Sequence, residues 1–253
     1  NQQYSDDAVV QRQVRLGHSV IQKSGAQSPK VASITSTLPV ADLVVKNRRQ
    51  IEEIYVENAS PAGTGDRLVI ANQAETAVKS GTLNQSTISG FGLSENITYT
   101  AIEDLEINLG SNADTVTVLD THLGQTTINT GPGADQVTIP MIHGLTTIHS
   151  GGDDDTINVS NTSHRLVDIH ANLWIHGNGG TDVINVDNGG SGANAFRTSD
   201  AAAGRLTSTQ LSGLNLDGII TYGSVEDLNL LLGSGQDLFT IDGTHAGTTD
   251  ISG

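Results

Sequence analysis

The sequence predicts an all-β fold: a right-handed parallel β-solenoid with about 20–21 residues per coil. Three segments share one pattern, namely INLGSNADTVTV from Ile107, INTGPGADQVTI from Ile128 and IHSGGDDDTINV from Ile148. In each, a Gly follows the first apolar residue, an Asp follows the Gly, and alternating apolar residues follow the Asp. Recurrence at a short period indicates stacked supersecondary units, and crossovers between parallel strands are nearly always right-handed.

Two further segments carry the same pattern. They are IHGNGGTDVINV, which contains Asp182, and LNLLLGSGQDLFTI, which contains Asp237. DTVTV and TTINT alternate apolar and polar residues with period two, so one face of each strand is expected to point inward. Stacking then predicts two interior columns, formed by Val116, Val137, Ile157 and Ile184 and by Val118, Ile139, Val159 and Val186.

Composition limits the function classes. The 253 residues include 29 Gly and no Cys, and aromatic residues make up 3%. This composition excludes a disulfide framework and a thiolate metal site. Residues 80–253 carry 20 of the 28 acidic residues but 3 of the 12 basic ones, which disfavours binding to nucleic acid or anionic lipid. No apolar run approaches the roughly 18 residues of a membrane span. We also expect a mature chain or a fragment without its signal peptide.

The domain organisation follows from a larger repeat. ITYTAIEDLEINLGSNADTVTV at 97–118 matches ITYGSVEDLNLLLGSGQDLFTI at 220–241, an offset of 123 residues. We therefore expect a first solenoid module and an incomplete second one, each with an insertion that leaves the stack as a lateral loop. The N-terminal segment is expected to form edge strands that act as a cap or an inter-subunit contact, with a short amphipathic helix near Val9–Val20 as the alternative. The expected segments are the cap at residues 1–50, the first module at 51–186 with its insertion at 71–96, and the second module at 187–253 with its insertion at 187–219.

The aspartates at the ends of the Gly-rich turns are the candidate metal ligands. Stacking places Asp114, Asp135 and Asp155 in one column, with Asp182 next in line, and like charges at this spacing repel one another. Asp153 and Asp154 add charge at one turn. Calcium binds six to eight carboxylate and carbonyl oxygens, so the column is consistent with calcium sites between consecutive turns. The alternative is that each Asp bonds backbone N–H groups of its own turn.

These turns resemble the calcium-binding repeat G-G-x-G-x-D-x-U-x of RTX (hemolysin-type) proteins. The motifs that carry the resemblance are GPGADQVTI, GGDDDTINV, GNGGTDVINV and GSGQDLFTI, and the modules are similar to tandem modules of very large secreted or surface proteins. The resemblance covers about residues 54–253 and implies a parallel β-solenoid, calcium-dependent folding outside the cell, and a structural or adhesive role. This sequence has one motif per 20–21 residues instead of one per nine, so ions are expected along one side only. Carried over by position, the calcium-associated residues are Asp114, Asp135, Asp155, Asp182 and Asp237, with the turn glycines Gly131, Gly133, Gly151, Gly152 and Gly179.

Several other features point away from catalysis. Glu103-Asp104 and Glu226-Asp227 are adjacent in segments expected to be strands, so their carboxylates are expected to face opposite ways, unlike a glycosidase pair. None of the common nucleophile, phosphate-loop, metalloprotease or dinucleotide motifs occurs.

We expect solvated outward ladders and, in a eukaryotic source, N-glycans. The polar ladder comprises Asn108, Asn129, His149 and His176. The hydroxyl ladder comprises the Thr pairs at 126–127, 146–147 and 248–249. The N-x-[ST] sequons begin at Asn58, Asn84, Asn96, Asn158 and Asn161.

The resulting expectation is a non-catalytic, extracellular or cell-surface structural solenoid. It would be a calcium-stabilised rod segment of a filament, sheath or adhesin, and it would associate with itself head-to-tail or within a longer tandem chain. The first alternative is an adhesin module that binds a carbohydrate or mineral surface through its Thr and Asn/His faces. The second is a polysaccharide-modifying β-helix enzyme or its repeat appendage.

Overall fold

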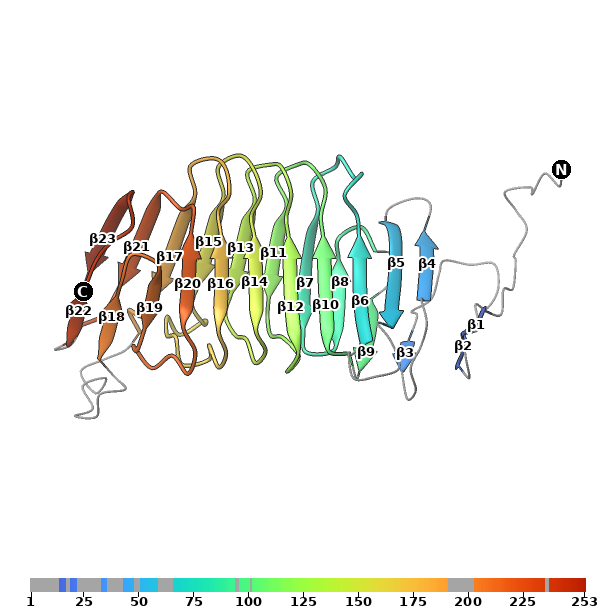
Figure 1. Ribbon diagram of the computed structural model, residues 1–253, viewed down its shortest axis with the longest axis horizontal. Coiled ribbons are helices and arrows are strands. Elements are labelled where there is room, and N and C mark those ends of the chain that lie inside the picture. Colours follow the sequence, from blue (N-terminus) through green and yellow to red (C-terminus); the bar gives the residue numbers. More distant parts are fainter. Residues whose placement is uncertain are drawn as a thin grey trace.

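The chain is all-β, with two large and mostly parallel sheets (Figure 1). The computed structural model describes residues 66–93, 96–100, 102–190, 203–234 and 237–253, together with five N-terminal strands within 14–58. The described residues contain no helix, and thus none long and apolar enough to cross a membrane. The predicted all-β class is confirmed at this level.

The first large sheet has 11 strands, and its strands are neighbours in the order that follows. They are β22 (Phe239–Ile241), β18 (Gly204–Leu206), β19 (Gln210–Ser212), β20 (Ile220–Gly223), β16 (Leu173–His176), β14 (Thr146–His149), β12 (Gln125–Asn129), β10 (Asp104–Asn108), β6 (Asp66–Ala71), β5 (Ile51–Asn58) and β4 (Leu43–Asn47).

The second large sheet has 10 strands. In spatial order these are β23 (Thr248–Ser252), β21 (Asp227–Leu231), β17 (Val183–Asp187), β15 (Thr156–Val159), β13 (Gln136–Ile139), β11 (Thr115–Val118), β7 (Ser80–Asn84), β8 (Thr87–Gly90), β9 (Ile97–Thr100) and β3 (Ser33–Thr35). A separate antiparallel pair consists of β1 (Val14–Leu16) and β2 (Ser19–Ile21).

Between β10 and β17 the chain alternates strictly between the two sheets. We call one strand of the 11-stranded sheet, the next strand of the 10-stranded sheet and the turn between them a rung. The rungs are therefore β10–β11, β12–β13, β14–β15 and β16–β17, and equivalent strands of successive rungs pair in parallel. All turns that lead to the 10-stranded sheet lie at one edge, the aspartate edge (109–114, 130–135, 150–155, 177–182). The turns that lead back lie at the opposite edge, the histidine edge (119–124, 140–145, 160–172).

The core is the thin space between the two sheets. Both predicted interior columns are fully buried, and their members are register partners on adjacent strands, such as Val137 with Ile157 and Ile157 with Ile184. The 11-stranded sheet supplies the opposing face from the same period-two alternation, for example with Ile128 and Ile148. Each rung therefore buries its aliphatic face against its neighbours and the facing sheet, as expected for a quasi-one-dimensional stack.

For the described residues the predicted lateral loops are wrong, whereas residues 94–95 and 191–202 of the two insertions lie outside the described part of the chain. Described residues of the 71–96 segment form β7 and β8, and those of the 187–219 segment form β18 and β19; all four belong to the large sheets. They build two antiparallel meanders, β7–β8–β9 and β18–β19–β20. Their sequences have too few alternating residues to look like strands, yet Leu83, Ile88, Leu206 and Leu211 are fully buried.

Each meander places three successive strands in one sheet and so shifts the alternation. The first meander lies in the 10-stranded sheet and the second in the 11-stranded sheet. The 123-residue repeat is visible in this topology, because β10 and β21 follow the meanders in the two modules yet lie in opposite sheets. Consequently Thr248 and Thr249 in β23 do not extend the Thr126–Thr146 column. They pair instead with Asp227 and Leu228 in the 10-stranded sheet.

The N-terminal segment contributes strands to all three sheets. β3 pairs in parallel with β9, and β4 pairs antiparallel with β5, so this part extends both large sheets. β1 and β2 occupy part of Val9–Val20 and its neighbour, where edge strands rather than a helix were expected first. The predicted role of residues 1–50 in capping or association stays a prediction.

Candidate functional site

A continuous ladder of carboxylates follows the aspartate edge. The backbone N–H of Asp114 donates to Oδ1 of Asp135 at 2.6 Å, and that of Asp135 donates to Oδ1 of Asp155 at 2.8 Å. The N–H of Asp155 donates in turn to Oδ1 of Asp182 at 3.0 Å. Besides contacts that three of them make within their own turns, with Gly110, Thr130 and Ser150, each side chain thus bonds the equivalent residue of the preceding rung. Both sequence-based interpretations missed this inter-rung role.

The ladder continues at both ends through residues that the repeat does not identify. The backbone N–H of Lys79 donates to Oδ1 of Asp114 at 2.6 Å. At the other end, the N–H of Asp182 donates to Oε2 of Glu226 at 2.8 Å. Glu226 lies in the β20–β21 turn, which the second meander brings to the aspartate edge. The sequence shows the carboxylate after ITYGSV. Its place in the column depends on the sheet shift, that is, on the change in strand alternation between the two sheets that the second meander introduces.

The second carboxylate oxygen of each ladder aspartate has no partner. Oδ2 of Asp114, Asp135, Asp155 and Asp182 is buried without a hydrogen bond from any described residue. The four residues are between 0% and 2% exposed, so bulk water does not reach these oxygens either. A buried unpaired polar atom costs on the order of 1–3 kcal/mol, and more when it is charged. A proton or a bound cation at Oδ2 would remove most of this cost.

The electrostatics agree with the geometry. Burial raises the pKa of Asp135 to about 6 and that of Asp155 to about 7, and the charges of neighbouring aspartates raise both further. Burial also raises the pKa of Asp114 and of Asp182. Hydrogen bonds act in the opposite direction, from the Thr130 side chain and the Asp114 N–H for Asp135 and from the Asp135 N–H and the Ser150 side chain for Asp155. They lower the pKa of each group but do not offset the loss of hydration. Without a counter-charge, the column favours the protonated state.

The Gly-rich turns are built so that rungs can approach closely at this edge. Gly131 and Gly151 have φ values of 94° and 99°, a region that L side chains rarely adopt. A Cβ on Gly131 would lie 2.1 Å from the carbonyl oxygen of Gly110, and one on Gly151 would lie 1.9 Å from that of Gly131. The glycine repeat in the sequence therefore reflects close rung packing. Gly152 and Gly179, which bridge in parallel on adjacent rungs, have no comparable restriction.

The structure does not bring all predicted metal ligands together. Asp153 and Asp154 are exposed outside the buried column, and Oδ1 of Asp154 accepts the backbone N–H of Thr181 at 2.7 Å. Asp237 is also exposed, and it lies in the β21–β22 turn at the histidine edge. The sheet shift explains this position, because the same turn motif falls at opposite edges in the two modules. Gly133, with a φ of 133°, belongs to the close turn of Asp135.

The donor set fits a hard cation through one feature, the unpaired Oδ2 atoms. Calcium prefers carboxylate and carbonyl oxygens, and each rung offers one buried carboxylate oxygen with no other partner. Within the described residues, no group of three or more His, Cys, Asp or Glu side chains forms a ready-made metal cluster. Any cation here would take Oδ2 of the ladder aspartates and complete its coordination with turn carbonyls or water.

The predicted polar ladder is confirmed on the outer face of the 11-stranded sheet. Asn108, Asn129, His149 and His176 are successive register partners. Nδ2 of Asn129 donates to Oδ1 of Asn108 at 2.7 Å, and the rings of His149 and His176 stack with centroids 4.8 Å apart. Asn108 is buried and the other three side chains are half-buried, so the ladder is less solvated than expected; its two imidazoles are parallel to within 11°.

His122 and His245 each pack against a buried tyrosine. Each ring meets a buried Tyr ring edge-on at 6.0 Å, with Tyr99 for His122 and Tyr222 for His245. The hydroxyl of each Tyr donates to a backbone carbonyl 15 residues earlier in the chain, at 2.7 Å in both modules. The repeated Tyr–His pair therefore anchors the meander to the following turn.

The sequons differ in accessibility. Asn84 and Asn96 are exposed, as a glycan acceptor requires. Asn158 is half-buried and its Oδ1 accepts Nδ2 of Asn185, whereas Nδ2 of Asn161 donates to Asp168 at 2.7 Å. The side chain of Asn58 lies outside the described residues. Glycosylation stays a prediction, and these environments favour Asn84 and Asn96.

Comparison with family models, with curated proteins and with solved structures found no match for this chain. The resemblance to RTX repeats therefore rests on the turn motifs alone and stays a prediction.

Proposed function

We propose that the chain is a non-catalytic, extracellular structural segment, a right-handed parallel β-solenoid that serves as a stiff rod in a surface filament, sheath or adhesin. The observation that carries this proposal is the continuity of its ladders. Backbone pairing, two aliphatic columns, the polar ladder and the carboxylate ladder all run in register from rung to rung. Such a stack resists bending because each rung is held at both sheets and at the aspartate edge.

Calcium is the proposed stabiliser of the rod at neutral pH. The support is the set of four buried Oδ2 atoms without partners in Asp114, Asp135, Asp155 and Asp182. Calcium bound to them would replace the missing hydration of carboxylates that otherwise repel one another. The acidic chain, at net charge −16, also attracts cations to its surface.

Small-angle X-ray scattering of the full chain, in calcium and in metal-free buffer, tests the rod directly. In calcium we expect the scattering of a rigid, elongated particle. In metal-free buffer near neutral pH we expect a broader distribution of dimensions, because the aspartate edge loosens. A compact, equant particle in calcium would contradict the rod. An elongated particle with identical scattering in both buffers would retain the rod and reject calcium as its stabiliser.

A second candidate function is carbohydrate binding on the outer face of the 11-stranded sheet. Trp174 is 44% exposed in the middle of this face, flanked by its register partners Thr147 and Thr221. An exposed indole on a flat, hydroxyl-rich surface suits stacking against a sugar ring. The chain contains one Trp, so a shift of its fluorescence on adding oligosaccharides reports this site alone. Unchanged fluorescence across a panel of glycans would reject the candidate.

A further inference from the structure

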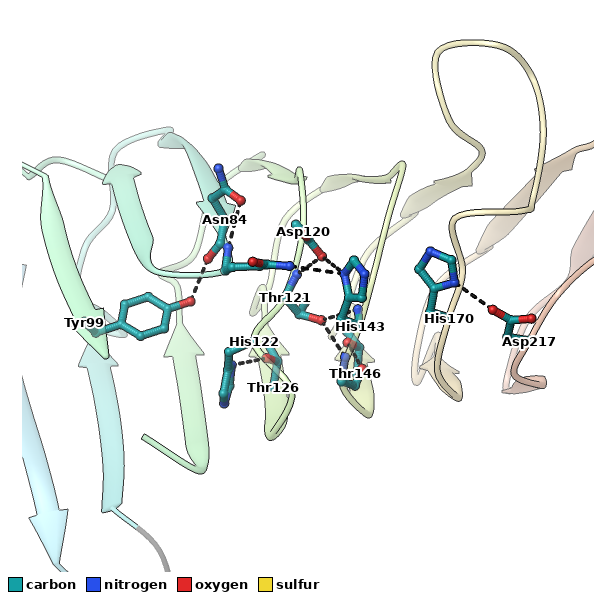
Figure 2. Close-up of polar contacts among 12 residues, drawn as sticks. Asn84, Tyr99, Asp120, Thr121, His122, Thr126, His143, Thr146, His170 and Asp217 are labelled. Carbon is teal, nitrogen blue, oxygen red and sulfur yellow. Dashed lines mark hydrogen bonds and ion pairs between the residues drawn. The ribbon is translucent and has the colours of Figure 1, made fainter. Parts of the chain in front are cut away.

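A row of four titratable side chains follows the histidine edge, opposite the aspartate column. It consists of Asp120, His143, His170 and Asp217, in this order along the stack (Figure 2). The first three come from turns that leave β11, β13 and β15, and Asp217 precedes β20. Neither the rod nor the aspartate column uses these residues.

The two imidazoles lie side by side between the two carboxylates. Nδ1 of His143 is 2.8 Å from Oδ1 of Asp120, and Nδ1 of His170 is 2.7 Å from Oδ2 of Asp217. The ring centroids of the two histidines are 4.7 Å apart, with a tilt of 36° between the ring planes. Nε2 of Gln85 also lies near Nδ1 of His143, at 3.3 Å, but the Asp120 carboxylate is closer, at 2.8 Å. Because a carboxylate only accepts, we assign the proton of each ring to Nδ1, which leaves each Nε2 as the basic nitrogen.

The turns hold this arrangement in place through the backbone. The N–H of His143 donates to the hydroxyl of Thr121 at 3.1 Å, and the N–H of His170 donates to the carbonyl of Ile142 at 2.9 Å. The N–H of Asp217 donates to a carbonyl of the His170 turn at 3.2 Å. Ligand groups fixed by such contacts lose little entropy when they bind.

The two Nε2 atoms are open to a ligand. The side chains of His143 and His170 are 32% and 34% exposed, and neither Nε2 has a hydrogen-bond partner among the described residues. A carboxylate that holds Nδ1 while Nε2 faces outward is the arrangement found behind metal-bound histidines, where it fixes the tautomer and raises the basicity of the ligand nitrogen.

We propose that His143 and His170 bind one divalent transition-metal ion, zinc or copper, through their Nε2 atoms. Asp120 and Asp217 orient the rings from behind. Imidazole nitrogens suit zinc, copper and nickel, whereas calcium prefers oxygen, so this site is chemically distinct from the aspartate column. Among the described residues no third His, Cys, Asp or Glu side chain joins these two as a ligand, so water completes the coordination and the site stays open.

The other histidine pair supplies an internal control. His149 and His176 have nearly the same ring separation, 4.8 Å, but their planes are within 11° of parallel. The nitrogen lone pairs of stacked rings run parallel and do not converge, while a zinc ion needs two nitrogens that each lie about 2.0–2.1 Å away. The stacked pair is therefore expected not to chelate.

The test is isothermal titration of the full-length chain with zinc chloride, in calcium-containing buffer that keeps the aspartate column in one state. We expect one saturable site, its loss in His143→Gln and separately in His170→Gln, and its retention in the matched control His149→Gln. Asp217→Asn should weaken binding by about 10–100-fold, the usual effect of removing a carboxylate behind a metal-bound His. Far-UV circular dichroism of each variant reports folding, and two independent His variants guard against one that misfolds.

Copper provides a second readout that does not depend on affinity. The electron paramagnetic resonance spectrum of the chain with one equivalent of Cu²⁺ should show hyperfine coupling to two imidazole nitrogens, and to one in His170→Gln. The proposal is overturned if the wild-type chain binds no zinc, if His143→Gln binds as tightly as wild type, or if His149→Gln abolishes binding. A copper spectrum with a single nitrogen in the wild-type chain would also overturn it.

Discussion

Replacing Asp155 with Asn separates the two roles of its carboxylate. The amide oxygen of Asn can still accept the backbone N–H of Asp135, which Oδ1 now accepts at 2.8 Å, while the buried charge at Oδ2 disappears. Burial raises the pKa of Asp155 from 3.8 to about 7. Since each pKa unit corresponds to about 1.4 kcal/mol, ionising this group in the folded chain costs about 4 kcal/mol relative to the unfolded chain.

The sign of the pH effect follows from the raised pKa. An acid whose pKa is higher in the folded state loses no stability below its unfolded pKa. As the pH rises from 3.8 towards about 7 and beyond, the folded chain is progressively destabilised. In metal-free buffer, Asp155→Asn should therefore raise the free energy of unfolding by up to about 4 kcal/mol at pH ~8 and change it little at pH ~4.

Urea unfolding followed by far-UV circular dichroism measures this difference. Asp153→Asn is the matched control, because Asp153 is exposed two residues away and its left-handed φ of 73° suits Asn. The control should change stability by no more than about 0.5 kcal/mol at either pH. If Asp155→Asn destabilises the chain at pH ~8, or acts equally at both pH values, the reasoning about its unpaired oxygen is refuted.

Three further substitutions test the packing of the stack, each by the shift of the urea midpoint. Tyr99→Phe removes a hydroxyl hydrogen bond to a backbone carbonyl and should cost about 1 kcal/mol; an unchanged midpoint would remove the Tyr–His anchor from the account. Gly131→Ala should cost more than about 1 kcal/mol because its φ is 94° and a Cβ would meet the Gly110 carbonyl, whereas Gly179→Ala, with nothing within 4 Å, should be nearly neutral. Equal effects of the two would exclude close rung packing as the reason for the glycine. Ile157→Ala opens a cavity between the sheets and should cost about 2–5 kcal/mol, and a loss below 1 kcal/mol would mean that this position is not core.

The short repeat predicted those parts of the fold where local patterning and tertiary packing agree. Period-two alternation placed Val137 and Ile157 inside, and the turn motif placed Asp135 and Asp155 in one column. The meanders were missed because Leu83 and its neighbours sit among Gly, Thr and Asn, so their burial depends on pairing with β11 and not on local periodicity. A wrong expectation at one meander then shifts every later assignment to a sheet.

The candidate site shows the same limit. The sequence identifies which aspartates recur, but not that Oδ1 bonds the preceding rung and leaves Oδ2 without a partner, since this depends on the distance between rungs. Glu226 and Asp237 illustrate the sheet shift. The first joins the column although it lacks the turn motif, and the second carries the motif but lies at the other edge. The histidine row also involves residues at unequal spacings, which no fixed period reveals.

We expect the unpaired oxygens of the aspartate column to make the folded chain depend on a bound cation at neutral pH. Thermal unfolding of the full-length chain, followed by far-UV circular dichroism with and without calcium at pH ~8 and pH ~5, tests it most directly. We expect calcium to raise the Tm at pH ~8, and we expect the metal-free chain to be more stable at pH ~5, where calcium has a smaller effect. A Tm at pH ~8 that is insensitive to calcium, in a chain no more stable at pH ~5, would contradict it.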